Sequence, residues 1–108
     1  MTVNLTPGHV RRAIDGDTVE LYNIGVPNYE QVRLLGVNTP EKNQPLYSEA
    51  TEFTANWLTK EDMILSVECK RDSFGRLLGT IKRESDGRDL GDDLIDAGLA
   101  VKYKPKKR

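Results

Sequence analysis

The stretch Val32-Arg33-Leu34-Leu35-Gly36-Val37-Asn38-Thr39-Pro40-Glu41 organises the rest of the chain. Its apolar residues occupy neighbouring positions, which predicts a strand over 30–37 that is buried on both faces. Arg33 lies within this strand, and a guanidinium inside a protein needs a carboxylate, a ligand anion or an open cleft. The stretch then ends in an amide, a hydroxyl, a proline and a carboxylate. We therefore expect a polar site at the end of a buried strand.

Two other segments offer charged side chains of the same kinds. They are Asp15-Gly16-Asp17-Thr18 and Asp72-Ser73-Phe74-Gly75-Arg76. Asp17 and Asn38 would supply oxygen ligands, which hard cations such as Ca²⁺ and Mg²⁺ prefer. With one histidine and one cysteine in the chain, a zinc site is not expected.

The arginines and Glu41 complete a pattern suited to phosphodiester chemistry. Two guanidiniums, Arg33 and Arg76, can hold the oxygens of a phosphate with paired hydrogen bonds. A carboxylate such as Glu41 can take a proton from an attacking water. Taken singly, each segment is better explained by ordinary turn or surface residues. Their joint occurrence predicts a metal-assisted phosphodiester site.

The composition is that of a small globular protein. A chain of 108 residues predicts one domain over 1–108. No apolar run is long enough to span a bilayer, and the N-terminus lacks the features of a signal peptide. We expect a soluble monomer with no membrane partner, cytoplasmic as given or secreted if a leader was removed. Cys69 cannot form an intramolecular disulfide and is expected to be a buried strand thiol.

Charge is distributed unevenly along the chain. The net charge is −1, from 16 basic and 17 acidic residues. The tail over 102–108 carries five of the basic residues and no acid, so residues 1–101 have 11 basic and 17 acidic residues, a net −6. A near-neutral total therefore does not exclude a nucleic-acid partner, because local basic surface decides that question.

Alternating and helical patterns predict five strands and two helices. The helices are Tyr47–Lys60 and a short one that is capped by Asp89 and ends at Gly98. The strands are His9–Ile14, Thr18–Tyr22, Glu30–Val37, Met63–Cys69 and Leu77–Arg83. Because the first helix follows the third strand, this order favours a mainly β fold with α, a five-stranded barrel of the oligonucleotide-binding (OB) type with two packed helices.

Five blocks of sequence, in order and spread over most of the chain, resemble staphylococcal (thermo)nuclease-like domains. The blocks are Ala13–Val19 (AIDGDTV), Arg33–Glu41 (RLLGVNTPE), Tyr47–Thr54 (YSEATEFT), Asp72–Leu78 (DSFGRLL) and Gly98–Ala100 (GLA). The resemblance implies a calcium-dependent endonuclease that acts on DNA and RNA and leaves 3′-phosphate ends.

The resemblance also implies roles for individual residues. Arg33 and Arg76 would bind phosphate, and Glu41 would activate water. Three residues would ligate the metal: Asp17, Asn38 through its amide oxygen and Thr39 through its backbone carbonyl. Asp15 would lie next to these ligands without binding the metal directly. Phe74 and Tyr103 would contact the nucleotide. Active relatives have an aspartate at the position of Asn38, so a weaker calcium site is expected here, because affinity follows the ligand charge.

Two alternatives stay open at this point. The first is a catalytically weak or inactive nuclease-like barrel that binds nucleic acid or a protein, for which Asn38 is the best evidence. The second is a small domain whose groove binds another phosphorylated or anionic ligand. Calcium-dependent release of nucleotides from single-stranded DNA would distinguish the nuclease from both.

Overall fold

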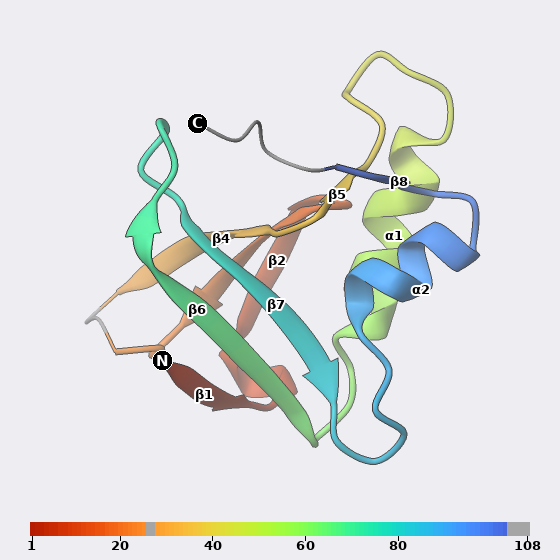
Figure 1. Cartoon of the computed structure of the whole chain (residues 1–108). Helices are drawn as coiled ribbons and strands as arrows, with labels where there is room; N and C mark the ends of the chain where they lie inside the picture. The colour runs from red at the N-terminus through yellow and green to blue at the C-terminus, as the bar shows by residue number, and fades with distance from the viewer. Residues whose placement is uncertain (26–27, 104–108) are drawn as a thin grey trace.

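In the computed structural model, which describes residues 1–25 and 28–103, most strands belong to one twisted sheet (Figure 1). Its strands, in spatial order, are β1 (Thr2–Leu5), β6 (Met63–Arg71), β7 (Leu77–Arg83), β4 (Tyr29–Leu34), β3 (Thr18–Tyr22) and β2 (Val10–Asp15). A second, two-stranded sheet pairs β5 (Val37–Asn38) with β8 (Val101–Lys102). The helices are α1 (Tyr47–Trp57), α2 (Leu90–Asp96) and the short 3₁₀ turn η1 (Pro7–His9).

The strand order brings distant segments of the chain together. β4 and β7 run parallel and place Arg33 beside Leu78, whereas the other pairs of the large sheet are antiparallel. β4 leads into β5, and β8 approaches β5 from the end of the chain. The ends of β3 and β4, all of β5 and the segment before β8 therefore meet in one region.

This architecture confirms the mixed α+β fold of the OB barrel type with two packed helices. It adds one strand to the large sheet that the sequence did not predict, β1, whose Leu5 is fully buried against β6. The predicted strand 30–37 was wrong at its end. Gly36 has a φ of +83°, a conformation that glycine adopts readily, and the turn at Leu35-Gly36 sends Val37 and Asn38 into the second sheet.

Other boundaries also differ from the predictions. α1 stops at Trp57 rather than Lys60, and β6 continues to Arg71. Cys69 is exposed, so the expectation of a buried thiol was wrong. Of the predicted basic tail over 102–108, residues 104–108 lie outside the described part of the chain. The longest helix of that part has 11 residues, and none is long and apolar enough to cross a membrane.

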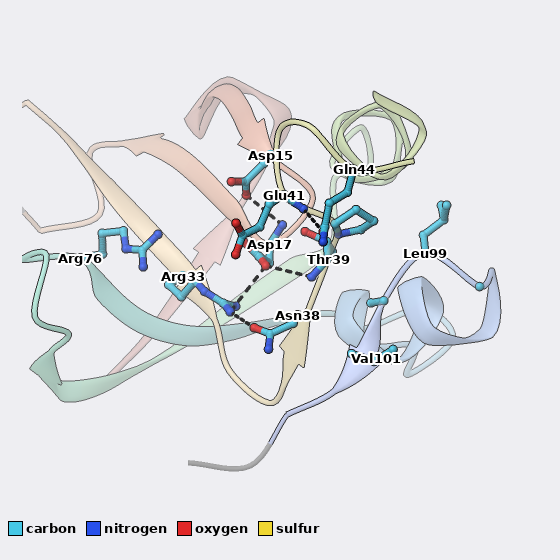
Figure 2. A pocket seen from close by; sticks show the side chains of 13 residues that line it. Asp15, Asp17, Arg33, Asn38, Thr39, Glu41, Gln44, Arg76, Leu99 and Val101 are labelled. Atoms are coloured by element: carbon cyan, nitrogen blue, oxygen red, sulfur yellow. Dashed lines mark hydrogen bonds and ion pairs between the residues drawn. The ribbon is translucent and has the colours of Figure 1, made fainter. Parts of the chain in front are cut away.

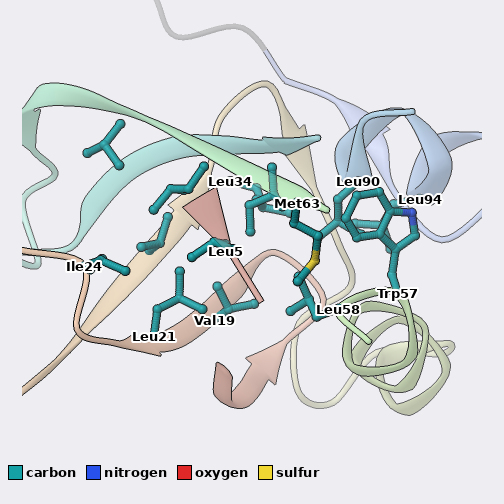
Figure 3. Packing of buried hydrophobic residues seen from close by; sticks show 14 of the residues in the cluster. Leu5, Val19, Leu21, Ile24, Leu34, Trp57, Leu58, Met63, Leu90 and Leu94 are labelled. Atoms are coloured by element: carbon teal, nitrogen blue, oxygen red, sulfur yellow. The ribbon is translucent and has the colours of Figure 1, made fainter. Parts of the chain in front are cut away.

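The core fills the space enclosed by the curved sheet and continues to the two helices (Figure 3). Val19 and Leu21 alternate along β3 and are fully buried, as expected for a strand with one face on the core. Trp57 of α1 and Leu90 and Leu94 of α2 fill the side nearest the helices. Burying such side chains stabilises the fold by about 1.5–3 kcal/mol each.

Helix α1 holds the turn between β2 and β3 through two hydrogen bonds and through close packing at Gly16. The Tyr47 hydroxyl donates to the backbone oxygen of Ile14 at 3.1 Å. Thr54, fully buried, donates to the oxygen of Gly16 at 2.6 Å. A Cβ at Gly16 would come within 2.7 Å of the Thr39 side chain and 2.9 Å of Ala50. The turn that carries Asp15 and Asp17 is therefore fixed against both the helix and the strand that carries the remaining polar groups.

Candidate active site

A cavity of about 650 Å³ opens where β3, β4, β5 and the segment before β8 meet (Figure 2). It contains all seven residues for which the sequence predicted a catalytic, metal-binding or supporting role. These residues are Asp15, Asp17, Arg33, Asn38, Thr39, Glu41 and Arg76. Six of them come from the two N-terminal segments, and Arg76 comes from the turn just before β7. The three segments thus converge as predicted.

Arg33 is held firmly at the floor of the cavity. Its Nη1 donates to the backbone oxygens of Leu34 at 2.7 Å and Val37 at 2.8 Å. Its Nη2 donates to the Asn38 side-chain oxygen and lies 3.5 Å from Oδ2 of Asp17. The turn at Leu35-Gly36 makes these contacts possible, because it folds the Val37 carbonyl back toward the guanidinium. The charge that the strand pattern left unexplained is therefore paired and points at the cavity.

Asp17 is 8% exposed and acts as the centre of the polar network. Its Oδ2 accepts the backbone N–H of Thr39 at 3.0 Å, and its Oδ1 accepts the Thr18 hydroxyl at 3.1 Å. Burial alone would raise the pKa of Asp17, but hydrogen bonds from Asp15 and Thr39 and the charge of Arg33 outweigh it and lower that pKa. Asp17 is therefore a carboxylate at neutral pH.

Asp15 is half-buried beside Asp17 and behaves differently. Its Oδ1 accepts the backbone N–H of Asp17 at 3.2 Å. Burial, and then the hydrogen bond and like charge of Asp17, raise the pKa of Asp15 to about 6. Two carboxyl groups this close repel each other when both are ionised. An additional positive charge at this point would favour ionisation of both.

Arg76 reaches the same cavity from the turn between β6 and β7. Its Nε donates to Oδ2 of Asp72 at 2.7 Å, and Nη1 lies 3.2 Å from the Thr18 hydroxyl. The guanidinium carbon also lies 5.2 Å from the centre of the Phe74 ring. Asp72 accepts the backbone N–H groups of Phe74 and Arg76 as well. This carboxylate therefore fixes both the turn and the direction of Arg76, which points toward Arg33 in Figure 2.

Glu41 begins the loop that follows β5, and Gln44 fixes its backbone. The Gln44 side-chain oxygen accepts the Glu41 N–H at 2.7 Å, and the Gln44 N–H donates to the Glu41 carbonyl at 2.8 Å. The Glu41 side chain is exposed and extends over the cavity on the side of Asp17 (Figure 2). This carboxylate therefore meets both solvent and the cavity.

Asn38 and Thr39 line the wall between Arg33 and Glu41. Because a guanidinium only donates hydrogen bonds, Asn38 presents its oxygen to Arg33. Thr39 is 8% exposed, and its hydroxyl is the only buried side-chain polar atom of residues 1–25 and 28–103 without a hydrogen-bond partner. A buried hydroxyl without a partner is costly, so this point of the wall suits a ligand or a water molecule.

A second cavity of about 460 Å³ adjoins the first and shares Arg33, Asn38 and Arg76 with it. Phe74, 82% exposed, and Tyr103, 45% exposed, lie along its edges. The two predicted nucleotide-contacting residues are thus brought together beside the arginines. An aromatic-edged hollow next to two guanidiniums can accept a flat ring joined to a phosphate.

Sequence reasoning missed some of the cavity lining. Gln44 and the residues of 98–101 contribute to the cavity, but they were not predicted to belong to the site. The proximity of Glu41 to Gln44, three residues later, was a usable signal, because such spacing allows a side chain to close a turn. The role of Asp72 in directing Arg76 could similarly have been inferred from their separation of four residues.

The donor set of the cavity is compatible with a hard cation. Asp15, Asp17 and Glu41 supply carboxylate oxygens, and Asn38 and Thr39 add amide, carbonyl and hydroxyl oxygens. Within residues 1–25 and 28–103, no three Asp, Glu, His or Cys side chains lie close enough to hold a metal ion by themselves. Neutral oxygens and water would have to complete a coordination shell, as Ca²⁺ and Mg²⁺ allow.

The chain was compared with known proteins. The model of the family described as staphylococcal nuclease homologue matches residues 31–108. A thermonuclease of Staphylococcus intermedius is 35% identical over 98 residues, which are 84% of this chain and 53% of that protein. Protein ParB of Escherichia coli is 29% identical, over 90% of this chain and 57% of its own length. An uncharacterized endonuclease of Escherichia coli O157:H7 is 28% identical, over 89% and 60%.

The chain therefore spans a little more than half the length of these relatives. The family match nevertheless covers most of the chain and includes most of β4, all of β5, both helices and the Asp72–Arg76 turn. It agrees with the OB-type barrel. This chain belongs to the staphylococcal nuclease homologue family.

Proposed function

We propose that the chain is a calcium-dependent endonuclease that hydrolyses phosphodiester bonds of DNA and RNA and leaves 3′-phosphate ends. One observation carries the proposal: Arg33, Arg76 and Glu41 face the same cavity, beside the ionised Asp17. The thermonuclease and endonuclease names of its relatives agree with this activity.

Both arginines would bind the scissile phosphate, but the protein fixes the position of one guanidinium more firmly than that of the other. Arg33 has four protein partners, so its position hardly depends on substrate. Arg76 is held by Asp72 through Nε and by the Thr18 hydroxyl through one N–H of Nη1, which leaves its other three N–H groups for phosphate oxygens. Pre-positioned donors stabilise the charge of a phosphorane-like transition state without a reorganisation cost.

Glu41 would accept the proton of the attacking water, since its carboxylate reaches over the cavity from a fixed backbone. Asp17, the amide oxygen of Asn38 and the carbonyl of Thr39 would hold Ca²⁺, and Asp15 would support Asp17. When bound, Ca²⁺ would neutralise phosphate charge and make nearby water more acidic. Phe74 and Tyr103 would hold the adjoining nucleotide in the second cavity.

The test is cleavage of a 5′-labelled single-stranded oligonucleotide with Ca²⁺ or with a chelator. We expect cleavage only with Ca²⁺, and products that a polymerase extends only after 3′-phosphatase treatment. Glu41→Gln, Arg33→Ala and Arg76→Ala should each lower the rate at least tenfold while the circular dichroism spectrum stays unchanged. Near-normal rates in all three variants would rule out the mechanism.

The second candidate is a binding module without useful catalysis. The observation that favours it is the amide of Asn38. Because active relatives have an aspartate at this position, the cavity has one carboxylate fewer than their sites. It predicts no cleavage at any Ca²⁺ concentration but salt-sensitive binding of the same oligonucleotide, because binding rests on phosphate contacts. Measuring both properties on one sample separates the candidates.

A further inference from the structure

We propose that the face of β2, β3 and β4 opposite the core binds an unpaired DNA or RNA strand beyond the cleaved phosphate. The inference rests on the proposed nuclease function and extends its substrate from a single linkage to a polynucleotide. The surface consists of Arg11, Arg12, Tyr22 and Tyr29, and we call it the tyrosine–arginine face.

Strand register connects this face to the active-site cavity. β3 and β4 pair Thr18 with Arg33, Glu20 with Gln31 and Tyr22 with Tyr29. Every second residue of a strand points to the same side of the sheet. The tyrosines therefore lie on the same side as Arg33, four residues along β4. At about 3.3 Å per residue, the separation along the strand is about 13 Å.

The two tyrosines form an exposed aromatic platform. Tyr22 and Tyr29 are 39% and 45% exposed. Their ring centres lie 6.2 Å apart and the ring planes cross at 89°, so each ring supports the other. The Arg11 guanidinium carbon lies 4.4 Å from the centre of the Tyr29 ring. Exposed rings next to guanidiniums are the groups on which single-stranded bases stack.

A buried carboxylate holds the two arginines in place. Glu20 is 3% exposed and accepts Nε of Arg12 at 2.9 Å, while Nε of Arg11 lies 3.5 Å from the same oxygen. Its other oxygen accepts the Gln31 amide at 3.3 Å. Two guanidiniums against one carboxylate leave a net positive charge, and the Arg12 side chain is 62% exposed. The face therefore combines aromatic surface with positive charge, as a polyanion with flat bases requires.

The geometry favours an unpaired strand of more than minimal length. Stacking on a protein ring requires a base that is not already stacked within a duplex. A span of about 13 Å corresponds to about four stacked nucleotides at 3.4 Å each, and to fewer in an extended strand. A trinucleotide cleaved at the arginines would scarcely reach the tyrosines, whereas a dodecamer would cover them.

The experiment compares two lengths of oligothymidylate on the same variants. Binding of (dT)₁₂ and (dT)₃ is measured by fluorescence anisotropy with Ca²⁺, in a Glu41→Gln background that prevents cleavage. Cleavage of (dT)₃ is measured with Glu41 intact. The variants are Tyr29→Ala and Arg11→Ala. The matched controls are Tyr29→Phe, which keeps the ring, and Lys60→Ala, which removes an exposed cation after α1.

We expect Tyr29→Ala and Arg11→Ala each to weaken (dT)₁₂ binding at least fivefold, with less than a twofold change in (dT)₃ binding or cleavage. Both controls should bind (dT)₁₂ within twofold of the parent. Unchanged (dT)₁₂ binding in both alanine variants would overturn the proposal while the nuclease function stands. An equal loss for (dT)₃ would also overturn it, because the effect would then come from the cavity. No binding or cleavage of either oligonucleotide by the parent proteins would overturn the proposed function as well.

Discussion

The proposed function makes Asn38 a ligand of Ca²⁺, so the charge at this position should set the affinity of the site for the cation. Its oxygen accepts a hydrogen bond from Arg33, and an aspartate could make the same contact while adding a negative charge. We expect Asn38→Asp to bind Ca²⁺ about tenfold more tightly, because calcium affinity rises with ligand charge. Isothermal titration calorimetry of both proteins would measure the change.

The same variant has an informative counterpart. Asn38→Ala removes the oxygen without adding charge, so it should bind Ca²⁺ no more tightly than the parent. If Asn38→Asp and the parent bind Ca²⁺ equally, residue 38 does not belong to the cation site.

The ionisation of Glu20 should make the stability of the protein depend on pH. The pKa of Glu20 is lowered, and the hydrogen bond from Arg12 is the largest cause. A carboxyl with a lowered pKa in the folded state stabilises the protein above its unfolded pKa, about 4.3, and this contribution is lost as pH falls through the folded value. Glu20→Gln should therefore be less stable than the parent at pH 7, and the difference should shrink below pH 4.

Urea unfolding at several pH values measures this difference. Glu61→Gln is a suitable control, since that exposed side chain has none of the ion pairs found within the described residues. A Glu20→Gln deficit that stays constant from pH 7 to pH 3 would show that packing, and not charge, explains the effect.

At the scale of elements, the contact between α1 and the β2–β3 turn positions the acidic half of the site. Thr54→Val keeps the side-chain shape but leaves the buried oxygen of Gly16 without its donor. An unsatisfied buried carbonyl costs about 1–3 kcal/mol. We expect a loss of this size in the free energy of unfolding, together with slower cleavage, because Asp15 and Asp17 flank Gly16.

Thr51→Val is the matched control on the same helix. The Thr51 hydroxyl donates to the backbone oxygen of Tyr47 within α1, so its hydrogen bond stays inside the helix. Its loss should change stability by less than about 0.5 kcal/mol. Equal losses in both variants would mean that the helix, and not its contact with the turn, is responsible.

Some elements could be predicted from the sequence and others could not, for physical reasons. Thr18–Tyr22 and Leu77–Arg83 were confirmed at both ends, since alternation and turn residues define them locally. β1 has only four residues and depends on pairing with β6, which local pattern does not reveal. The end of β4 depends on the conformation of Gly36. Because the residues on both sides of this glycine are apolar, the sequence pattern does not show that the strand stops there.

The site shows the same division. The three segments with charged residues, together with the family resemblance, were enough to predict seven side chains that line one cavity in the structure. The pairing of Arg33 with the Val37 carbonyl required the turn at Gly36, and the support of Glu41 by Gln44 required the loop conformation. The tyrosine–arginine face was not predicted, because it depends on the register between β3 and β4.

At the scale of the whole molecule, charge is divided between regions with different roles. The acidic stretch from Glu84 to Asp96 is partly neutralised within the fold, where Arg83 and Arg88 pair with Asp86, Asp93 and Asp96. The cations after Tyr103 have no acidic neighbours in sequence. A polyanionic substrate would therefore meet the tail as its most basic segment.

Deleting residues 104–108 tests this division, because it removes four cations: Lys104, Lys106, Lys107 and Arg108. Each phosphate contact on single-stranded nucleic acid contributes about 0.7 to the slope of log affinity against log salt. The deletion should therefore reduce that slope by up to about 3 and weaken binding most at low salt. Replacing the four cations by glutamine should have the same effect, whereas a scrambled tail of the same composition should bind like the parent. An unchanged slope after deletion would mean that the cavity and its adjoining face supply all of the phosphate contacts.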